Sequence, residues 1–103
     1  MYRIDPKALH LAREFRDNPI GHHSPDLELV LNVLRAGSIE GKYCLVCIKP
    51  FEEWRLARLS GKRGVPPEVL HNRVYHSIVE AEWDVFKLRW FEATGHTIDD
   101  AEL

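Results

Sequence analysis

The segment from Ser77 to Gly95 constrains the fold more than any other, because it predicts a long helix with two apolar stripes. Ser77 and Glu80 form a capping box, S-x-x-E, and Gly95 supplies a stop. We therefore expect a helix from Ser77 to about Ala93 or Thr94. At about 100° per residue, its apolar residues fall into two groups. The first stripe contains Ile78, Ala81, Val85 and Leu88. The second stripe contains Val79, Trp83, Phe86 and Trp90.

A helix that lies on a single sheet or helix pair needs only one apolar stripe. The second stripe therefore predicts a second contact, for which there are two interpretations. Three aromatic side chains of about 150–250 Å² each would, in water, rival the largest apolar patch usual on a monomer, about 300–600 Å². Either a hairpin covers one stripe and the N-terminal helices cover the other, or the second stripe binds another chain. Tryptophan is common at interfaces, so we favour a partner. The contact residues expected on this helix are Val79, Trp83, Phe86 and Trp90.

Two shorter helices are predicted before the middle of the chain. Asp5-Pro6 is a typical helix start, and Asn18-Pro19 ends the helix because a residue before proline avoids the α region. Residues 18–23 form a loop. Ser24-Pro25 repeats the start signal, and Ala36-Gly37 closes the second helix, with Gly37 free to adopt a positive φ.

The middle of the chain is β-prone. Residues 43–48 predict a buried strand, residues 51–53 a turn and residues 54–59 a second strand, which together make an antiparallel hairpin with a flexible segment at 60–64. A helix over 54–59 is the alternative, since Trp54, Ala57 and Arg58 also fit helical spacing. Val69-Leu70 indicates a third, short strand. The expected fold is therefore α+β, with residues 1–95 as a single domain and residues 96–103 as a polar, frayed tail.

Composition narrows the classes of function. The chain has 103 residues, and its 14 Lys and Arg against 16 Asp and Glu give a net charge of −2, which argues against a general nucleic-acid binder. The sequence contains no run of 18 apolar residues, so it predicts no membrane span. The N-terminus lacks an apolar stretch long enough for a signal peptide. Because the chain has two cysteines and no secretion signal, we expect the protein to be located in the reducing cytoplasm.

Cys44 and Cys47 have the C-x-x-C spacing of metal knuckles and redox pairs. The residues between them, Leu45 and Val46, are β-prone and include no turn former. Residues three apart in a strand point to opposite faces, so the two sulfurs would diverge. We interpret both cysteines as core residues.

Histidines raise a second hypothesis. His22 and His23 are adjacent in a loop, and His10 and Glu14 lie four apart on the first helix. Such residues can bind a metal, although loop histidines more often bond to backbone. The alternative function is a stand-alone, self-associating domain that binds a metal or small ligand through His22, His23 and nearby side chains.

A small basic hairpin is the remaining candidate surface. It comprises Trp54, Arg55, Arg58, Lys62 and Arg63. It would suit an acidic partner or a phosphate, or it is a solvated hairpin end. No nucleophile elbow, phosphate loop or paired carboxylates are present, so we assign no catalytic residue and expect no enzyme acting alone.

Several segments together resemble the small (alpha) subunit of N,N-dimethylformamidase and its relatives. They are Asn18-Pro19-Ile20-Gly21, His23-Ser24-Pro25-x-Leu27, Gly41-Lys42-Tyr43, Glu53-Trp54, Arg55-Leu56-Ala57-Arg58-Leu59, Ser77-x-x-Glu80-Ala81 and Val85-Phe86. Their order and rough spacing agree over about residues 18–91, and the order carries the resemblance.

The resemblance implies an accessory subunit that packs against a large catalytic subunit and stabilises it. In that family, the large subunit holds an iron and carries out the amide hydrolysis. No catalytic residue and no metal ligand of this chain follow from it. The surface expected to bind the partner comprises Trp83, Phe86, Trp90, Val79, Trp54, Arg55 and Arg58.

Overall fold

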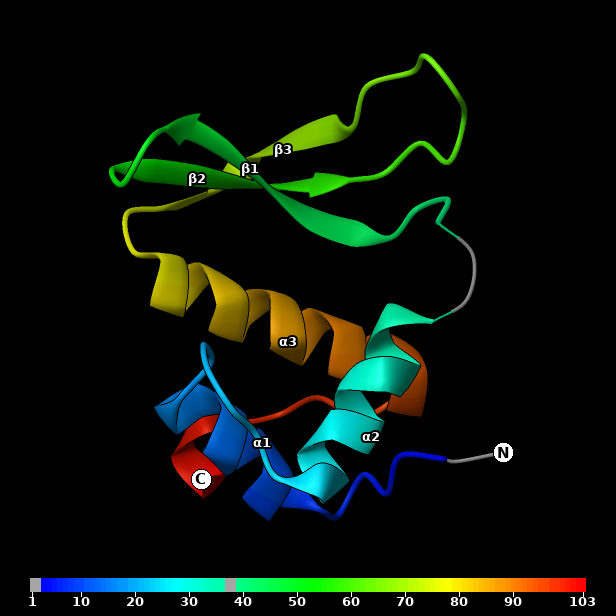
Figure 1. Cartoon of the computed structure of the whole chain (residues 1–103), viewed down its shortest axis with the longest axis vertical. Helices are drawn as coiled ribbons and strands as arrows, with labels where there is room; N and C mark the ends of the chain where they lie inside the picture. The colour runs from blue at the N-terminus through cyan, green and yellow to red at the C-terminus, as the bar shows by residue number, and fades with distance from the viewer. Residues whose placement is uncertain (1–2, 37–38) are drawn as a thin grey trace. The chain divides into compact units, whose positions relative to one another are not determined.

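The computed structural model describes residues 3–36 and 39–103. In this part of the chain the elements follow one another as three helices, three strands and a short 3₁₀ helix (Figure 1). They are α1 (Leu9–Asp17), α2 (Pro25–Arg35), β1 (Tyr43–Lys49), β2 (Glu53–Arg58), β3 (Glu68–Tyr75), α3 (Ile78–Thr94) and η1 (Asp100–Glu102). The predicted α+β fold, with two N-terminal helices, a hairpin and a long C-terminal helix, is confirmed.

The chain divides into two compact units. The helical unit comprises Met1–Gly37 and Phe86–Leu103, and the sheet unit comprises Ser38–Val85. The long helix α3 contributes to both, because the division falls between Val85 and Phe86. No helix in the described ranges is long and apolar enough to cross a membrane.

Helix α2 of the helical unit begins as its sequence predicts. The Ser24 hydroxyl accepts a hydrogen bond from the Leu27 backbone N–H at 3.3 Å, and Pro25 occupies the first helical position. Its buried stripe is formed by Leu27, Val30, Leu31 and Leu34. The prediction for Gly37 lies outside the described residues.

The start predicted for the first helix is wrong. The Asp5 carboxylate accepts from the Lys7 N–H at 2.9 Å, and the Asp5 carbonyl oxygen accepts from the Ala8 N–H at 3.0 Å. These bonds close a turn ahead of α1, which begins only at Leu9. Asp5 therefore caps a turn, and α1 has no side-chain cap.

The C-terminal tail is more ordered than predicted. Gly95 has a φ of 76° and ends α3 as expected. Beyond it, Ile98 is buried, and Lys87 forms an ion pair with Asp100 at 3.1 Å. The segment 96–103 is therefore attached to the helical unit, because one apolar and one charged side chain find partners there.

The sheet unit is an antiparallel sheet in the order β1-β2-β3. Residues 54–59 lie mostly in β2, so the hairpin is confirmed and the helical alternative is wrong. The third strand spans eight residues, where Val69-Leu70 alone was predicted. Gly61 adopts a φ of 71°, and a Cβ there would lie 2.8 Å from the Glu40 backbone, so this close approach requires glycine.

Candidate functional site

Both stripes of α3 are largely covered by the chain itself. In the sheet unit, Ala81 and Val85 of the first stripe are buried. In the helical unit, the Phe86 ring stacks on Phe15 with centroids 4.4 Å apart, and Trp90 is fully buried. The preference for a partner over internal cover is therefore wrong for Phe86 and Trp90 of the second stripe.

The four predicted contact residues of α3 thus fall into two groups. Phe86 and Trp90 are 2% and 0% exposed, which gives both side chains a place in the core. Val79 is 46% exposed and Trp83 is half-buried, so these two keep surface that another chain can contact. The part of the predicted surface that stays accessible on α3 is its N-terminal half.

The predicted basic hairpin is divided between the two faces of the sheet. Trp54 and Arg58 lie on the same face as the buried Leu56, and Arg55 lies on the opposite face, because strand side chains alternate. Arg55 Nε donates to a Glu53 carboxylate oxygen at 3.1 Å. These cations therefore do not form one patch.

Arg58 is engaged within the sheet unit. Its Nη1 donates to the Gly41 carbonyl oxygen at 2.9 Å, its Nη2 donates to the Tyr43 hydroxyl, and its guanidinium lies 4.0 Å from the centre of the Tyr43 ring. Tyr43 and Arg58 are also direct partners in the β1–β2 register. Arg58 therefore fastens the outer strand to the central one.

Of the two loop histidines, His23 is hydrogen-bonded to the backbone. His23 Nε2 donates to the Asn18 carbonyl oxygen at 2.8 Å, and its ring stacks on Phe15. His22 is exposed. Among the described residues, no group of three or more His, Cys, Asp or Glu is arranged to hold a metal ion.

Glu14, which was paired with His10 as a possible metal ligand, instead accepts hydrogen bonds from Ser24 at the start of α2. Its two carboxylate oxygens accept from the Ser24 hydroxyl at 2.6 Å and from the Ser24 backbone N–H at 2.7 Å. These hydrogen bonds lower the pKa of Glu14 because they favour the ionised carboxylate. The carboxylate therefore joins α1 to α2.

Cys44 and Cys47 lie on β1 and are not joined in a disulfide. Their side chains point to opposite faces, as three-residue spacing in a strand requires. Cys44 is half-buried and Cys47 is exposed, so the prediction that both are core residues is wrong. β1 becomes exposed from Cys47 onward, which is why the second thiol meets solvent.

A polar cluster that the sequence did not reveal joins β3 to α3. The Tyr75 hydroxyl and Arg73 Nη1 both donate to the same oxygen, Oδ2 of Asp84, the latter at 2.7 Å. Burial, followed by this carboxylate, raises the pKa of Tyr75. The phenol therefore remains a protonated donor at neutral pH, which suits a structural tie.

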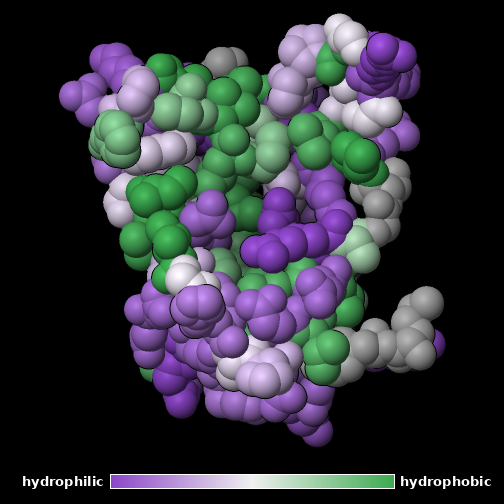
Figure 2. Space-filling view, in the orientation of Figure 1, coloured by the Kyte–Doolittle hydropathy of each residue, from purple (hydrophilic) through white to green (hydrophobic). Residues whose placement is uncertain are grey.

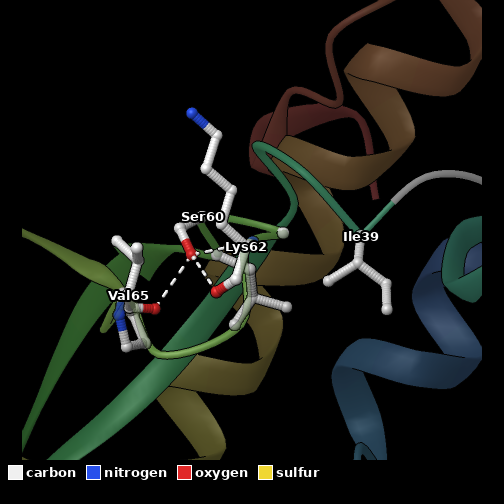
Figure 3. Close-up of a pocket in the computed structure, with 7 residues that line it drawn as sticks. Ile39, Ser60, Lys62 and Val65 are labelled. Carbon is white, nitrogen blue, oxygen red and sulfur yellow. Dashed lines mark hydrogen bonds between the residues drawn. The ribbon is translucent and has the colours of Figure 1, made fainter.

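A small hollow of about 220 Å³ lies beside the β2–β3 loop (Figure 3). It is lined by Ile39, Leu59, Ser60, Gly61, Lys62, Val65 and Pro67. The Ser60 hydroxyl is 2.9 Å from the Val65 carbonyl oxygen and accepts from the Lys62 N–H at 3.1 Å. Because it holds the loop together, Ser60 acts here as a structural residue.

The turn between β1 and β2 presents an aromatic side chain to solvent. Phe51 is 92% exposed and has a φ of 63°. The Glu52 N–H donates to the Lys49 carbonyl oxygen at 3.0 Å, and Pro50 precedes Phe51, so residues 49–52 form a type II turn. Figure 2 shows further hydrophobic side chains gathered over the strands.

Sequence reasoning identified this turn but missed its exposed aromatic residue. A signal was present, since an aromatic residue directly after Pro50 occupies the turn position that usually takes Gly or Asn. The sequence signal identifies Phe51 as a candidate contact residue only when the backbone conformation and the exposure of the ring are also known.

The family model for the N,N-dimethylformamidase alpha subunit matches residues 4–99. The chain belongs to this family. The match covers all of α1 through α3 and extends over most of both compact units. A search of curated proteins returns no match. The resemblance inferred from residues 18–91 is confirmed, and membership extends over almost the whole chain.

Proposed function

We propose that this member of the N,N-dimethylformamidase alpha subunit family is a non-catalytic accessory subunit of an amide hydrolase. It binds a large catalytic subunit and stabilises it. The family match over residues 4–99 is the observation that carries this proposal, because an alpha subunit belongs to an enzyme with more than one kind of chain.

The polar side chains with the clearest partners in this chain support an accessory role. Glu14 accepts hydrogen bonds at the start of α2, Arg58 donates to Tyr43 of the neighbouring strand, and Asp84 accepts from Tyr75. Each of these groups has a structural task. We assign the iron and the hydrolytic step to the large subunit, as the resemblance to the family implies.

The accessible part of the predicted surface supports binding to another chain. Val79, Trp83 and Trp54 keep exposed or half-exposed apolar area, and aromatic side chains are common at interfaces.

Co-expression tests the proposal. The large N,N-dimethylformamidase-type subunit encoded in the same genome carries an affinity tag, and this chain is untagged. We expect the chain to elute with the tagged subunit in a fixed ratio. We also expect the large subunit to lose soluble yield, and with it release of dimethylamine from N,N-dimethylformamide, when the chain is omitted. An unbound chain, or a genome without such a large subunit, contradicts the proposal.

A further inference from the structure

The β1–β2 turn holds a large apolar side chain almost wholly outside the protein. Phe51 is 92% exposed, the highest value among the large hydrophobic residues that the structure describes. Its ring therefore adds almost no buried area to the fold. Contribution to the core does not account for a phenylalanine at this position.

The backbone at Phe51 is also unfavourable for a side chain. A φ of 63° lies in the left-handed region, which costs residues other than glycine free energy because Cβ approaches the carbonyl oxygen. Residue three of a type II turn is therefore usually Gly or Asn. The aromatic residue at this position costs folding free energy, and its exposed ring contributes almost no burial that would offset the cost.

The backbone of the turn is held by hydrogen bonds on both sides of Phe51. Pro50 fixes its own φ near the value that the second turn position needs. The Glu52 N–H bonds to the Lys49 carbonyl oxygen, and His76 Nδ1 donates to the Glu52 carbonyl oxygen at 3.1 Å. A side chain on a preorganised turn loses less conformational freedom when it binds.

The surroundings of Phe51 match a protein partner with an apolar pocket. Ile48 on β1 and Val74 on β3 are 43% and 40% exposed and extend the apolar surface of the same unit. Lys49 and Glu52 beside the turn carry opposite charges. This balance disfavours an anionic lipid surface or a nucleic acid, both of which attract clustered cations.

We propose that Phe51 is an anchor residue that inserts into an apolar pocket of the large catalytic subunit. The inference rests on the proposed function, since it names the residue through which the accessory subunit binds. An aromatic side chain that fills a partner pocket dominates the affinity of many interfaces. Ile48 and Val74 offer further exposed apolar surface on the same unit.

The test compares Phe51→Gly with the wild-type chain in competition for the tagged large subunit. Both chains are co-expressed in equal amounts and distinguished by mass. We expect the complex to contain at least tenfold less of the Phe51→Gly chain, although glycine suits the turn and leaves the variant as thermally stable as the wild type. Phe91→Ala is the matched control, since Phe91 is an exposed aromatic residue of the other unit, 48% exposed.

The outcomes separate this inference from the proposed function. If the wild-type chain does not bind the large subunit, the proposed function fails. If it binds and Phe51→Gly competes equally, or if Phe91→Ala weakens binding as much, the inference is overturned. Phe51→Asn, which also tolerates a positive φ, repeats the test if Phe51→Gly does not fold.

Other occupants would give other results. Sedimentation of the wild-type chain with phosphatidylglycerol vesicles, lost in Phe51→Gly while the complex forms normally, would assign the turn to a membrane and overturn the inference. A wild-type dimer in analytical ultracentrifugation that becomes monomeric in Phe51→Gly, again with normal complex formation, would assign it to a second copy and also overturn it.

Discussion

Phe86 of the helical unit and Phe51 of the sheet unit lie in opposite environments. In the helical unit, Phe15, Phe86 and Trp90 form a buried aromatic cluster, in which Phe86 stacks on Phe15. In the sheet unit, Phe51 stands in solvent on a strained turn. Removal of a buried ring leaves a cavity, whereas removal of an exposed ring leaves none. The same residue type therefore supports stability in one unit and is available for binding in the other.

Trp90→Ala should have the largest effect on folding. Because the side chain is fully buried, its removal is expected to lower the free energy of unfolding by about 3–5 kcal/mol, a large share of the stability of a small domain. Urea unfolding followed by circular dichroism measures it. Phe91→Ala on the same helix is the control and should cost less than about 1 kcal/mol. Equal losses in the two variants would break the comparison.

Asp84→Ala tests the polar tie of the sheet unit. It leaves the buried Tyr75 hydroxyl without its acceptor, which should cost about 1–3 kcal/mol. Tyr75→Phe in the Asp84→Ala background removes the orphaned hydroxyl and should restore part of the loss. A double-mutant cycle by urea unfolding measures this coupling. Additive losses would show that the hydrogen bond is not a tie.

Glu14→Gln tests the polar link of the helical unit through pH. The folded-state pKa of Glu14 is lowered from 4.5, so its stabilisation is complete above pH 4.5 and is lost as pH falls through the lower folded value. We expect the variant to be less stable by about 1–2 kcal/mol at pH 7. The gap from wild type should narrow as pH falls below 4.5. A gap that is constant with pH would contradict the role of the charge.

Phe51→Gly should have the smallest effect on folding, and its sign is opposite. Glycine relieves the left-handed strain but loses chain entropy, so the net gain in unfolding free energy is about 0–1 kcal/mol. The midpoint of thermal unfolding measures it. A clear loss of stability would mean that the Phe51 ring supports the sheet unit, and the contrast between the two units would disappear.

Local chemistry explains which parts of the fold were predictable. The Ser24 cap, the Ser77 cap and the Gly95 stop act within one turn of helix, so the sequence contains the full signal. Asp5-Pro6 shows the limit, because the same residues also close an isolated turn. The third strand was underestimated because polar residues interrupt its middle, where pairing with β2 determines its extent.

The candidate site was less predictable because it depends on what covers each side chain. Two apolar stripes on α3 indicate two contacts, but periodicity cannot say whether the second contact is internal, as it is at Phe86 and Trp90. Spacing grouped Arg55 with Arg58, although strand alternation separates them. Phe51 requires a dihedral angle and an exposed fraction, which no sequence pattern contains.

Helix α3 couples the unfolding of the two units. It passes from one to the other between Val85 and Phe86 without a break in its hydrogen-bonded ladder. Because each turn of a helix is propagated from the turn before it, melting of residues 78–85 withdraws support from residues 86–94, and the reverse also holds. Heating should accordingly produce a single cooperative calorimetric peak, although the chain has two centres of packing.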